Sequence, residues 1–193
     1  NMLVKTYGSA VSGIHATTIT IEVDVAQGIK FFLVGLPDNA VKESEQRIRA
    51  ALKNNGYRIP GKKITINMAP ADIRKEGSAY DLPLAIGILA ASQQIKSEKV
   101  SDYLIMGELS LDGSLQPIKG ALPIAVKARE AGFKGIILPK QNAREAAIVN
   151  NLEVLGVENI VEVINFFDGK QVIAPTLIDT RAEFLAGLNN NIA

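Results

Sequence analysis

Apolar and polar residues alternate in several short stretches, beginning near the N-terminus. In TTITIEVDV (17–25) every second position from 19 onwards is Ile or Val, which is the pattern of a strand with one buried face. FFLVG (31–35) predicts a second strand, joined to the first by a turn at Gln27–Gly28. KKITINMAP (62–70) alternates again and predicts a third strand.

Between these strands the apolar residues take helical spacing. The segment 37–56 predicts a helix that Asp38 or Asn39 caps at its start and Gly56 terminates as the residue after the C-cap. The run LPLAIGILAA (82–91) is apolar on every side, which indicates a helix packed against a sheet on more than one face. Asp81 is expected to cap this second helix.

The C-terminal half continues with strands and helices in turn. Asp112–Gly113 is a strong signal for a hairpin, and Asn142 and Asn159 each precede a Glu by three residues, as in a capping box. The predicted elements are a hairpin over 103–118, helices over 121–132, 143–149 and 160–167, and strands over 134–139 and 152–157. This order predicts an α+β fold in which helices pack on a mixed sheet. We expect one domain over residues 2–170, and a linker or the start of another module over 171–193.

Composition narrows the classes of function. The 193 residues contain 21 Lys and Arg against 20 Asp and Glu, so the net charge of +1 does not indicate a molecule-wide field for a polyanion. The chain has no Cys and one His, His15, which excludes disulfides, thiolate metal sites and clusters of several histidines. No apolar run approaches the roughly 20 residues that span a bilayer. We therefore expect a cytoplasmic protein with no membrane partner and a natural start at Met2.

Positive charge is nevertheless concentrated locally, over residues 38–63. Seven Lys and Arg side chains face three carboxylates there, an excess of four. Such a segment is either a solvated helix face or a surface for nucleic acid or an acidic neighbouring subunit. Its GYRIPGK stretch matches G-x-x-x-x-G-K, but Lys63 replaces the Ser or Thr of a P-loop, and the stretch follows a helix instead of opening one. We interpret it as a basic turn.

Ser78 is a candidate nucleophile, because it lies just before a helix N-terminus, where free N–H groups stabilise negative charge. A serine needs a base. His15 stands alone in a loop of small residues, so a lysine would have to serve. Lys75 lies in a charged run and is expected to be solvated, whereas Lys119 ends the hairpin and could meet Ser78.

Four long segments resemble one family in order along the chain: 10–52, 67–92, 106–132 and 135–146. Together they resemble the N-terminal, Lon-protease-like (ChlI-type) domain of the Mg-chelatase-like AAA+ ATPases of the YifB/ComM type, over about residues 2–170. The resemblance implies the ribosomal S5 domain 2-like fold that Lon proteolytic domains share, which agrees with the mixed sheet.

The relation to Lon implies that the proteolytic dyad is missing. Lon enzymes carry Lys-Asp-Gly-Pro-Ser-Ala-Gly, and here Lys75 and Gly77 match while Ala79 stands at the nucleophile. Their Pro-Ile-Gly-Gly-Leu-Lys aligns with residues 117–122, which puts Leu122 at the base. Ser78 is then part of a turn that starts a helix.

Two alternatives remain open. A shifted Ser78–Lys119 dyad would form a Lon-type peptidase, and it predicts a hydrogen bond of about 3 Å between the two side chains. A pure oligomerisation module would form rings without binding nucleic acid.

For the whole protein the resemblance implies an ATP-driven hexameric ring that acts on DNA, in competence and recombination through branch migration. ATP and Mg²⁺ would bind an AAA+ module outside these residues, since no complete Walker motif occurs here, and this chain itself would bind no cofactor and no metal. Its partners would be that module, other copies of the protein and DNA. Candidate DNA contacts are Lys62, Lys63, Arg74, Lys75 and Lys119.

Overall fold

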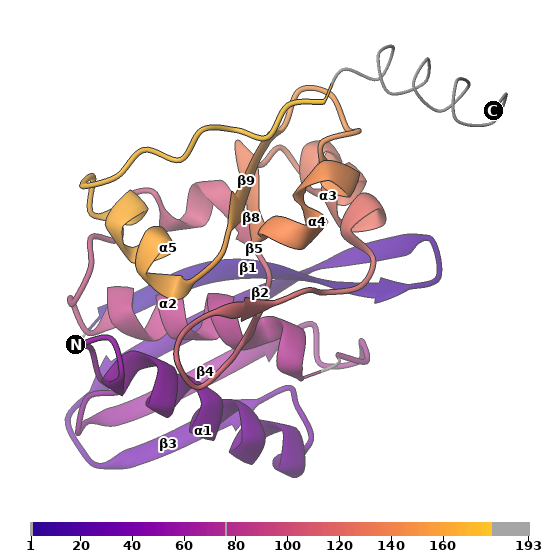
Figure 1. Ribbon diagram of the computed structural model, residues 1–193. Helices are drawn as coiled ribbons and strands as arrows, with labels where there is room; N and C mark the ends of the chain where they lie inside the picture. The colour runs from indigo at the N-terminus through magenta and orange to yellow at the C-terminus, as the bar shows by residue number, and fades with distance from the viewer. Residues whose placement is uncertain (1, 76, 179–193) are drawn as a thin grey trace, which may run out of the picture.

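The computed structural model describes residues 2–75 and 77–178 (Figure 1). Its strands are β1 (Met2–Ser12), β2 (His15–Ala26), β3 (Lys30–Val34), β4 (Lys63–Ala69), β5 (Tyr103–Ile105), β6 (Glu108–Leu109), β7 (Leu115–Gln116), β8 (Gly135–Pro139) and β9 (Glu153–Val157). Its helices are α1 (Asp38–Lys53), α2 (Asp81–Ala91), α3 (Ala121–Glu130), α4 (Lys140–Ala146) and α5 (Ile160–Phe167), with short 3-10 turns η1 (Ser78–Tyr80) and η2 (Val100–Asp102).

Seven of these strands form one mixed sheet in the order β3-β4-β2-β1-β5-β8-β9, and β6 pairs with β7 in a small antiparallel ribbon. Helices pack on this sheet, so the predicted α+β class is confirmed. The turn of the ribbon lies at Asp112–Gly113 as predicted, with Ser110 N donating to Ser114 O at 2.8 Å.

The antiparallel half of the sheet is built on a long hairpin. β1 and β2 pair from Met2↔Val25 to Ser12↔His15, and β4 adds to the other side of β2. Residues 27–29 connect β2 to β3, as expected. These two strands are not neighbours in the sheet, because β4 lies between them. β1 was not predicted, because Leu3 is 57% exposed while Thr6 is fully buried, which hides the usual pattern of apolar residues inside.

The other half of the sheet is parallel. β5, β8 and β9 pair in parallel, and every residue of β5 and β8 is buried. Continuous apolar runs of this kind are typical of strands covered on both faces. One register pair, Tyr7↔Leu104, joins this half to β1.

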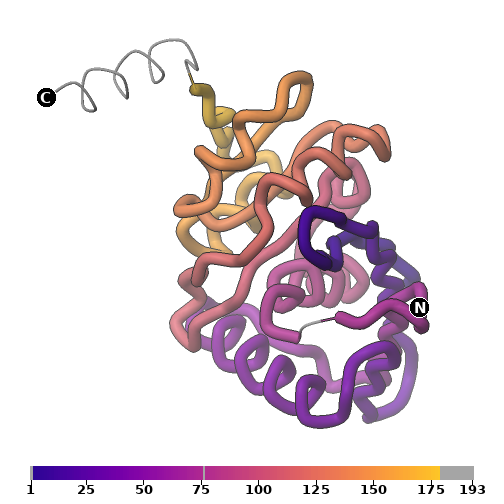
Figure 2. The backbone as a smooth tube through the Cα atoms, turned by 90° about the vertical axis from the view of Figure 1, so that its right-hand side faces the viewer, coloured from indigo at the N-terminus to yellow at the C-terminus, as the bar shows by residue number. Residues whose placement is uncertain are grey.

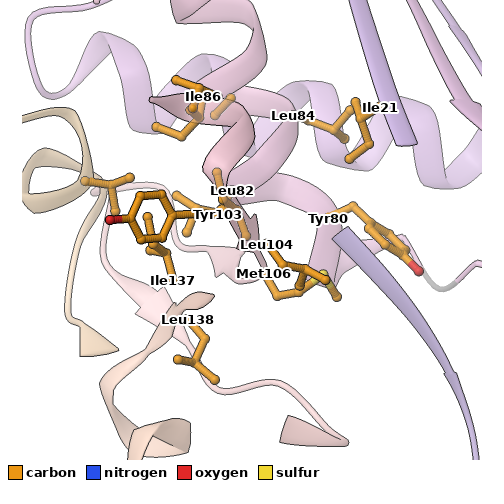
Figure 3. Close-up of a cluster of buried hydrophobic side chains, with 14 of the residues drawn as sticks. Ile21, Tyr80, Leu82, Leu84, Ile86, Tyr103, Leu104, Met106, Ile137 and Leu138 are labelled. Carbon is orange, nitrogen blue, oxygen red and sulfur yellow. The ribbon is translucent and has the colours of Figure 1, made fainter. Parts of the chain in front are cut away.

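Helix α2 lies at the centre of the core. All of its residues are buried, as its all-round apolar sequence predicted, and it packs on β1 and β2 while α1 packs on it. Figure 3 shows Leu82, Leu84 and Ile86 of α2 among side chains of the two sheet halves, including Ile21 and Ile137. Gly87 lets the helix approach the sheet, because a Cβ there would lie 2.7 Å from Val23 Cγ2.

The predicted helix ends are right in some places and wrong in others. Gly56 terminates α1 as predicted: its φ is +81° and Tyr57 N donates to Leu52 O at 2.9 Å. Asn159 caps α5 by accepting from Glu162 N, also as predicted. Neither Asp38 nor Asn39 caps α1, since the helix already includes Asp38 and Pro37 holds the cap position.

Asn142 does not cap a helix either. α4 starts three residues earlier than predicted, at Lys140, so Asn142 lies inside it. Its side-chain amide bonds both backbone groups of Ile118: Oδ1 accepts from Ile118 N at 2.9 Å and Nδ2 donates to Ile118 O at 2.8 Å. This contact fixes the backbone next to Lys119.

The segment after α5 follows the open edge of the sheet, where Thr176 N donates to Val154 O of β9 at 2.8 Å. Residues 179–193 of the predicted linker lie outside the described residues, and the domain boundary at 170 stays a prediction. Within the described part of the chain, no helix is long and apolar enough to cross a membrane.

Candidate functional site

A cleft of about 930 Å³ opens where the free end of the β1–β2 hairpin meets the loop that leads into α2. Figure 2 shows the turn of this hairpin, in indigo, beside the magenta start of α2. The cleft is lined by Ser9, Ala10, Val11, Ser12, His15, Thr17, Asp72, Ile73, Arg74, Ser78, Ala79, Tyr80, Met106, Glu108, Pro117, Ile118 and Lys119. It therefore collects several residues that the sequence analysis selected for chemical reasons.

Ser78 and Lys119 both line this cleft, although they are 41 positions apart in the chain. Within the described residues no hydrogen bond joins them, so the contact that the shifted dyad requires is not formed. Ser78 begins η1, the turn that runs directly into α2, as the sequence predicted. Among residues 2–75 and 77–178, no base accepts a hydrogen bond from its hydroxyl.

The two aligned Lon positions are apolar in the structure as in the sequence. Ala79 lies in the cleft wall, and its carbonyl accepts from Gly107 N at 2.9 Å. Leu122 is partly buried in the first turn of α3, where it packs against the core. Neither side chain can act as nucleophile or base.

Lys75 is not solvated, contrary to expectation. Its side chain is directed into its own loop, where Nζ donates to Pro70 O at 2.7 Å and to Ile73 O at 3.0 Å, and the residue is 5% exposed. Burial lowers the pKa of Lys75 from its ordinary value, and the nearby Asp72 carboxylate opposes this change. Lys75 therefore stabilises the loop that contributes Ile73 to the lining of the cleft.

Asp81 does not cap α2 but anchors a buried network. Because η1 is already helical at Tyr80, no cap position exists at Asp81. Its carboxylate accepts from Ser44 Oγ at 2.5 Å, from Arg47 Nε at 2.6 Å and Nη2 at 3.1 Å, and from Leu109 N at 3.1 Å. The network thus ties α1, α2 and β6 together beneath the cleft.

The electrostatics of this network reflect its burial. Desolvation raises the pKa of Asp81, which is fully buried, while the bonds from Arg47 and Ser44 act in the opposite direction. The hydrogen bond to Asp81 in turn raises the pKa of Arg47. This role of Asp81 was not predicted, although the sequence shows Ser44 and Arg47 three positions apart on a helix and an Asp before an apolar run.

The charges that face the cleft nearly balance. Arg74 and Lys119 supply two exposed cations, and Asp72 and Glu108 supply two carboxylates, with His15 beside them. Among the described residues no three acidic or His side chains converge as metal ligands. The cleft is thus a mixed-charge groove, not a concentrated field of one sign.

Lys62 and Lys63 lie at the opposite end of the sheet. Lys63 begins β4 and pairs with Ala26, the last residue of β2, whereas the cleft is at the Ser12↔His15 end of the same sheet. Lys62 lines a small hollow with Met2 and Val25. Of the five candidate DNA contacts, Arg74 and Lys119 line the cleft, and Lys62 and Lys63 lie at the opposite end of the sheet. Lys75 belongs to neither exposed group, because its side chain is buried and bonded to its own loop.

Comparison with known proteins finds relatives over most of the chain. A family model described as subunit ChlI of Mg-chelatase matches residues 21–142. YifB of Escherichia coli is 43% identical over 165 residues, which are 85% of this chain and 32% of YifB. Competence protein ComM of Haemophilus influenzae is 38% identical over 186 residues, which are 95% of this chain and 36% of ComM.

More distant similarity extends to proteases. Lon protease 2 of Bacillus subtilis is 28% identical over 126 residues, 64% of this chain and 22% of the protease, in agreement with a Lon-like fold. The chain spans about a third of the length of YifB and ComM. On the family match and these two relatives, the chain belongs to the Mg-chelatase-like ChlI family, in the group that contains YifB and ComM.

Proposed function

We propose that this chain is a non-catalytic, Lon-like accessory domain of an AAA+ ATPase that acts on DNA. In this proposal ATP and Mg²⁺ bind a motor module elsewhere in a longer, hexameric protein, which drives branch migration in competence or recombination. The domain stacks on the motor ring and shapes the entry for DNA. The name of ComM as a competence protein supports the process, and the family match supports the architecture.

One observation carries the non-catalytic part of the proposal. The cleft lies where Ser78, Ala79 and Lys119 come together, yet the aligned Lon positions hold Ala79 and Leu122. Without a nucleophile and base in contact, the remaining binding groups supply little turnover. The cleft is then a binding or contact surface that has kept its shape.

The experiment compares the full-length protein with a form that lacks residues 2–170. ATP hydrolysis and branch migration of a synthetic four-way junction are measured for both. We expect hydrolysis in both forms and a loss of junction movement in the truncated form. Absence of ATP hydrolysis in the full-length protein would refute the proposal, and so would equal junction movement in the two forms.

A Ser-Lys peptidase is the second candidate, because Ser78 and Lys119 line the same cleft. It requires the two side chains to come within about 3 Å of each other when a peptide binds. Cleavage of an unfolded protein by the chain, abolished in both Ser78→Ala and Lys119→Ala, would establish it. Equal background cleavage in the wild type and both variants would remove it.

A further inference from the structure

Four exposed cations gather at the end of the sheet farthest from the cleft. We call this group the basic sheet end, and its members are Lys30, Arg58, Lys62 and Lys63. Lys30 begins the edge strand β3, and Lys63 begins β4 beside it. Arg58 and Lys62 come from the connection between α1 and β4.

Lys30 and Lys63 are register partners on neighbouring parallel strands. The backbone positions that carry their two ammonium groups are therefore about 4.8 Å apart. Like charges opposite each other on adjacent strands repel and reduce stability. Neither lysine forms an ion pair with any of the described residues. Lys30 Nζ instead lies 5.7 Å from the centre of the Phe32 ring. Such a pair is well suited to an external anion that neutralises both charges.

Residues of the turn after α2 contact the segment that carries Arg58 and Lys62. The backbone of Arg58 is held by two hydrogen bonds to the side chain of Gln94, at 3.2 and 2.8 Å. Gln93, the residue before it, lines the same small hollow as Lys62. The backbone around these cations is therefore fixed, while their side chains remain exposed.

The local charge balance distinguishes the basic sheet end from the cleft. Along the paired strands β2 and β4, the carboxylate nearest to Lys63 is Asp24, which pairs with Thr65 two positions after Lys63. The cleft, by contrast, offsets Arg74 and Lys119 with Asp72 and Glu108. We therefore expect the first surface to attract a polyanion more strongly than the second.

We propose that the basic sheet end binds the phosphate backbone of nucleic acid, through Lys30, Arg58, Lys62 and Lys63. This deepens the proposed function, on which it rests for the choice of DNA as the polyanion. The cations are spread over separate elements on an open surface, which suits a row of phosphates better than a single enclosed one. Lysine contacts to phosphate position a protein on DNA without reading its sequence, so binding is independent of sequence.

The test measures binding of a short, fluorescently labelled DNA duplex to the chain as the salt concentration rises. The Lys30→Ala/Lys63→Ala variant is compared with Arg74→Ala/Lys119→Ala, which removes the same charge from the cleft. Each lost phosphate contact reduces the slope of log K against log salt by about 0.9. We expect the first variant to lose about 1.8 from the slope and at least tenfold in affinity, and the second to lose clearly less in both slope and affinity.

A charge-retaining variant, Lys30→Arg/Lys63→Arg, should bind as the wild type does, and urea unfolding of every variant shows that folding is preserved. An equal or larger loss in the cleft variant overturns the inference, as does an unchanged slope in the first variant. A wild-type chain that binds no duplex also overturns it, while the ATP-hydrolysis and junction measurements on the full-length protein still decide the proposed function separately.

Discussion

Replacement of Asp81 tests the buried network most directly. In Asp81→Ala the Ser44 hydroxyl, which is 1% exposed, and the buried Leu109 N–H lose their acceptor. Arg47 loses both of its bonds, although its side chain is 22% exposed and regains some water. Each orphaned neutral donor costs about 1–3 kcal/mol, and removing one partner of a buried ion pair costs about 3–5 kcal/mol.

These costs do not add in full. Asp81→Ala also removes the cost of burying a carboxylate, which offsets part of the loss. We therefore expect Asp81→Ala to lower the free energy of unfolding by about 3–5 kcal/mol. Ser44→Ala, which leaves the Arg47 and Leu109 donors in place, should cost about 1.5–3 kcal/mol. Urea unfolding followed by circular dichroism measures both values.

A double-mutant cycle between Arg47→Ala and Asp81→Ala isolates their interaction, for which contacting residues give coupling of about 0.5–3 kcal/mol. Arg49→Ala is the matched control. Its pair with Glu45, at 3.2 Å on the exposed side of the same helix, is worth about 0.3–0.5 kcal/mol. An Asp81→Ala loss below about 1 kcal/mol, comparable with this control, would refute the reasoning about burial.

Three further predictions concern packing, pH and the cleft wall. Gly87→Ala should destabilise the protein by about 1–3 kcal/mol despite the better helix propensity of Ala, because its Cβ meets Val23 at 2.7 Å; a gain in thermal stability would contradict this. Burial raises the pKa of Tyr103 to about 12, so the folded state holds its proton more tightly and stability falls as pH rises from about 10 to about 12. Tyr103→Phe should lose less stability than the wild type over this range in urea titrations, and parallel curves would count against the role of Tyr103. Asn142→Ala leaves both backbone groups of Ile118 without their partner and should cost about 1–3 kcal/mol, while Asn142→Asp, which puts a carboxylate oxygen against Ile118 O in place of the Nδ2 donor, should cost more; a reversed order in thermal melts would disprove this account.

Sequence patterns predicted the elements whose burial is one-sided or complete. The alternation in β2 has the two-residue period of a strand, and α2 was recognised as a continuous apolar run that is long enough for a buried helix. β1 was missed, since it carries a buried Thr6 and an exposed Leu3. Asp81 and Asn142 were misassigned as caps because local sequence shows only what a polar side chain could bind nearby, whereas their partners lie 24 to 37 positions away.

The candidate site was predictable only in part, because its residues come from distant parts of the chain. The sequence selected Ser78 and Lys119, and the structure places both in one cleft. The sequence could not show that the Lys75 ammonium group donates to carbonyl groups of its own loop, or that Lys30 and Lys63 lie side by side. Both contacts depend on the path of the backbone.

The single register pair between Tyr7 and Leu104 has a consequence for how the chain acquires its structure. Residues 2–69 complete four strands among themselves: β1, β2 and β4 pair antiparallel, and β3 pairs parallel with β4. Residues 103–157 complete the parallel half. The seam between the halves joins positions 97 residues apart, so it forms after the local pairings that cost less chain entropy. A chain emerging from the ribosome therefore holds β1 with one unpaired edge until β5 has been synthesised, and that edge is the place where premature pairing with another chain would begin.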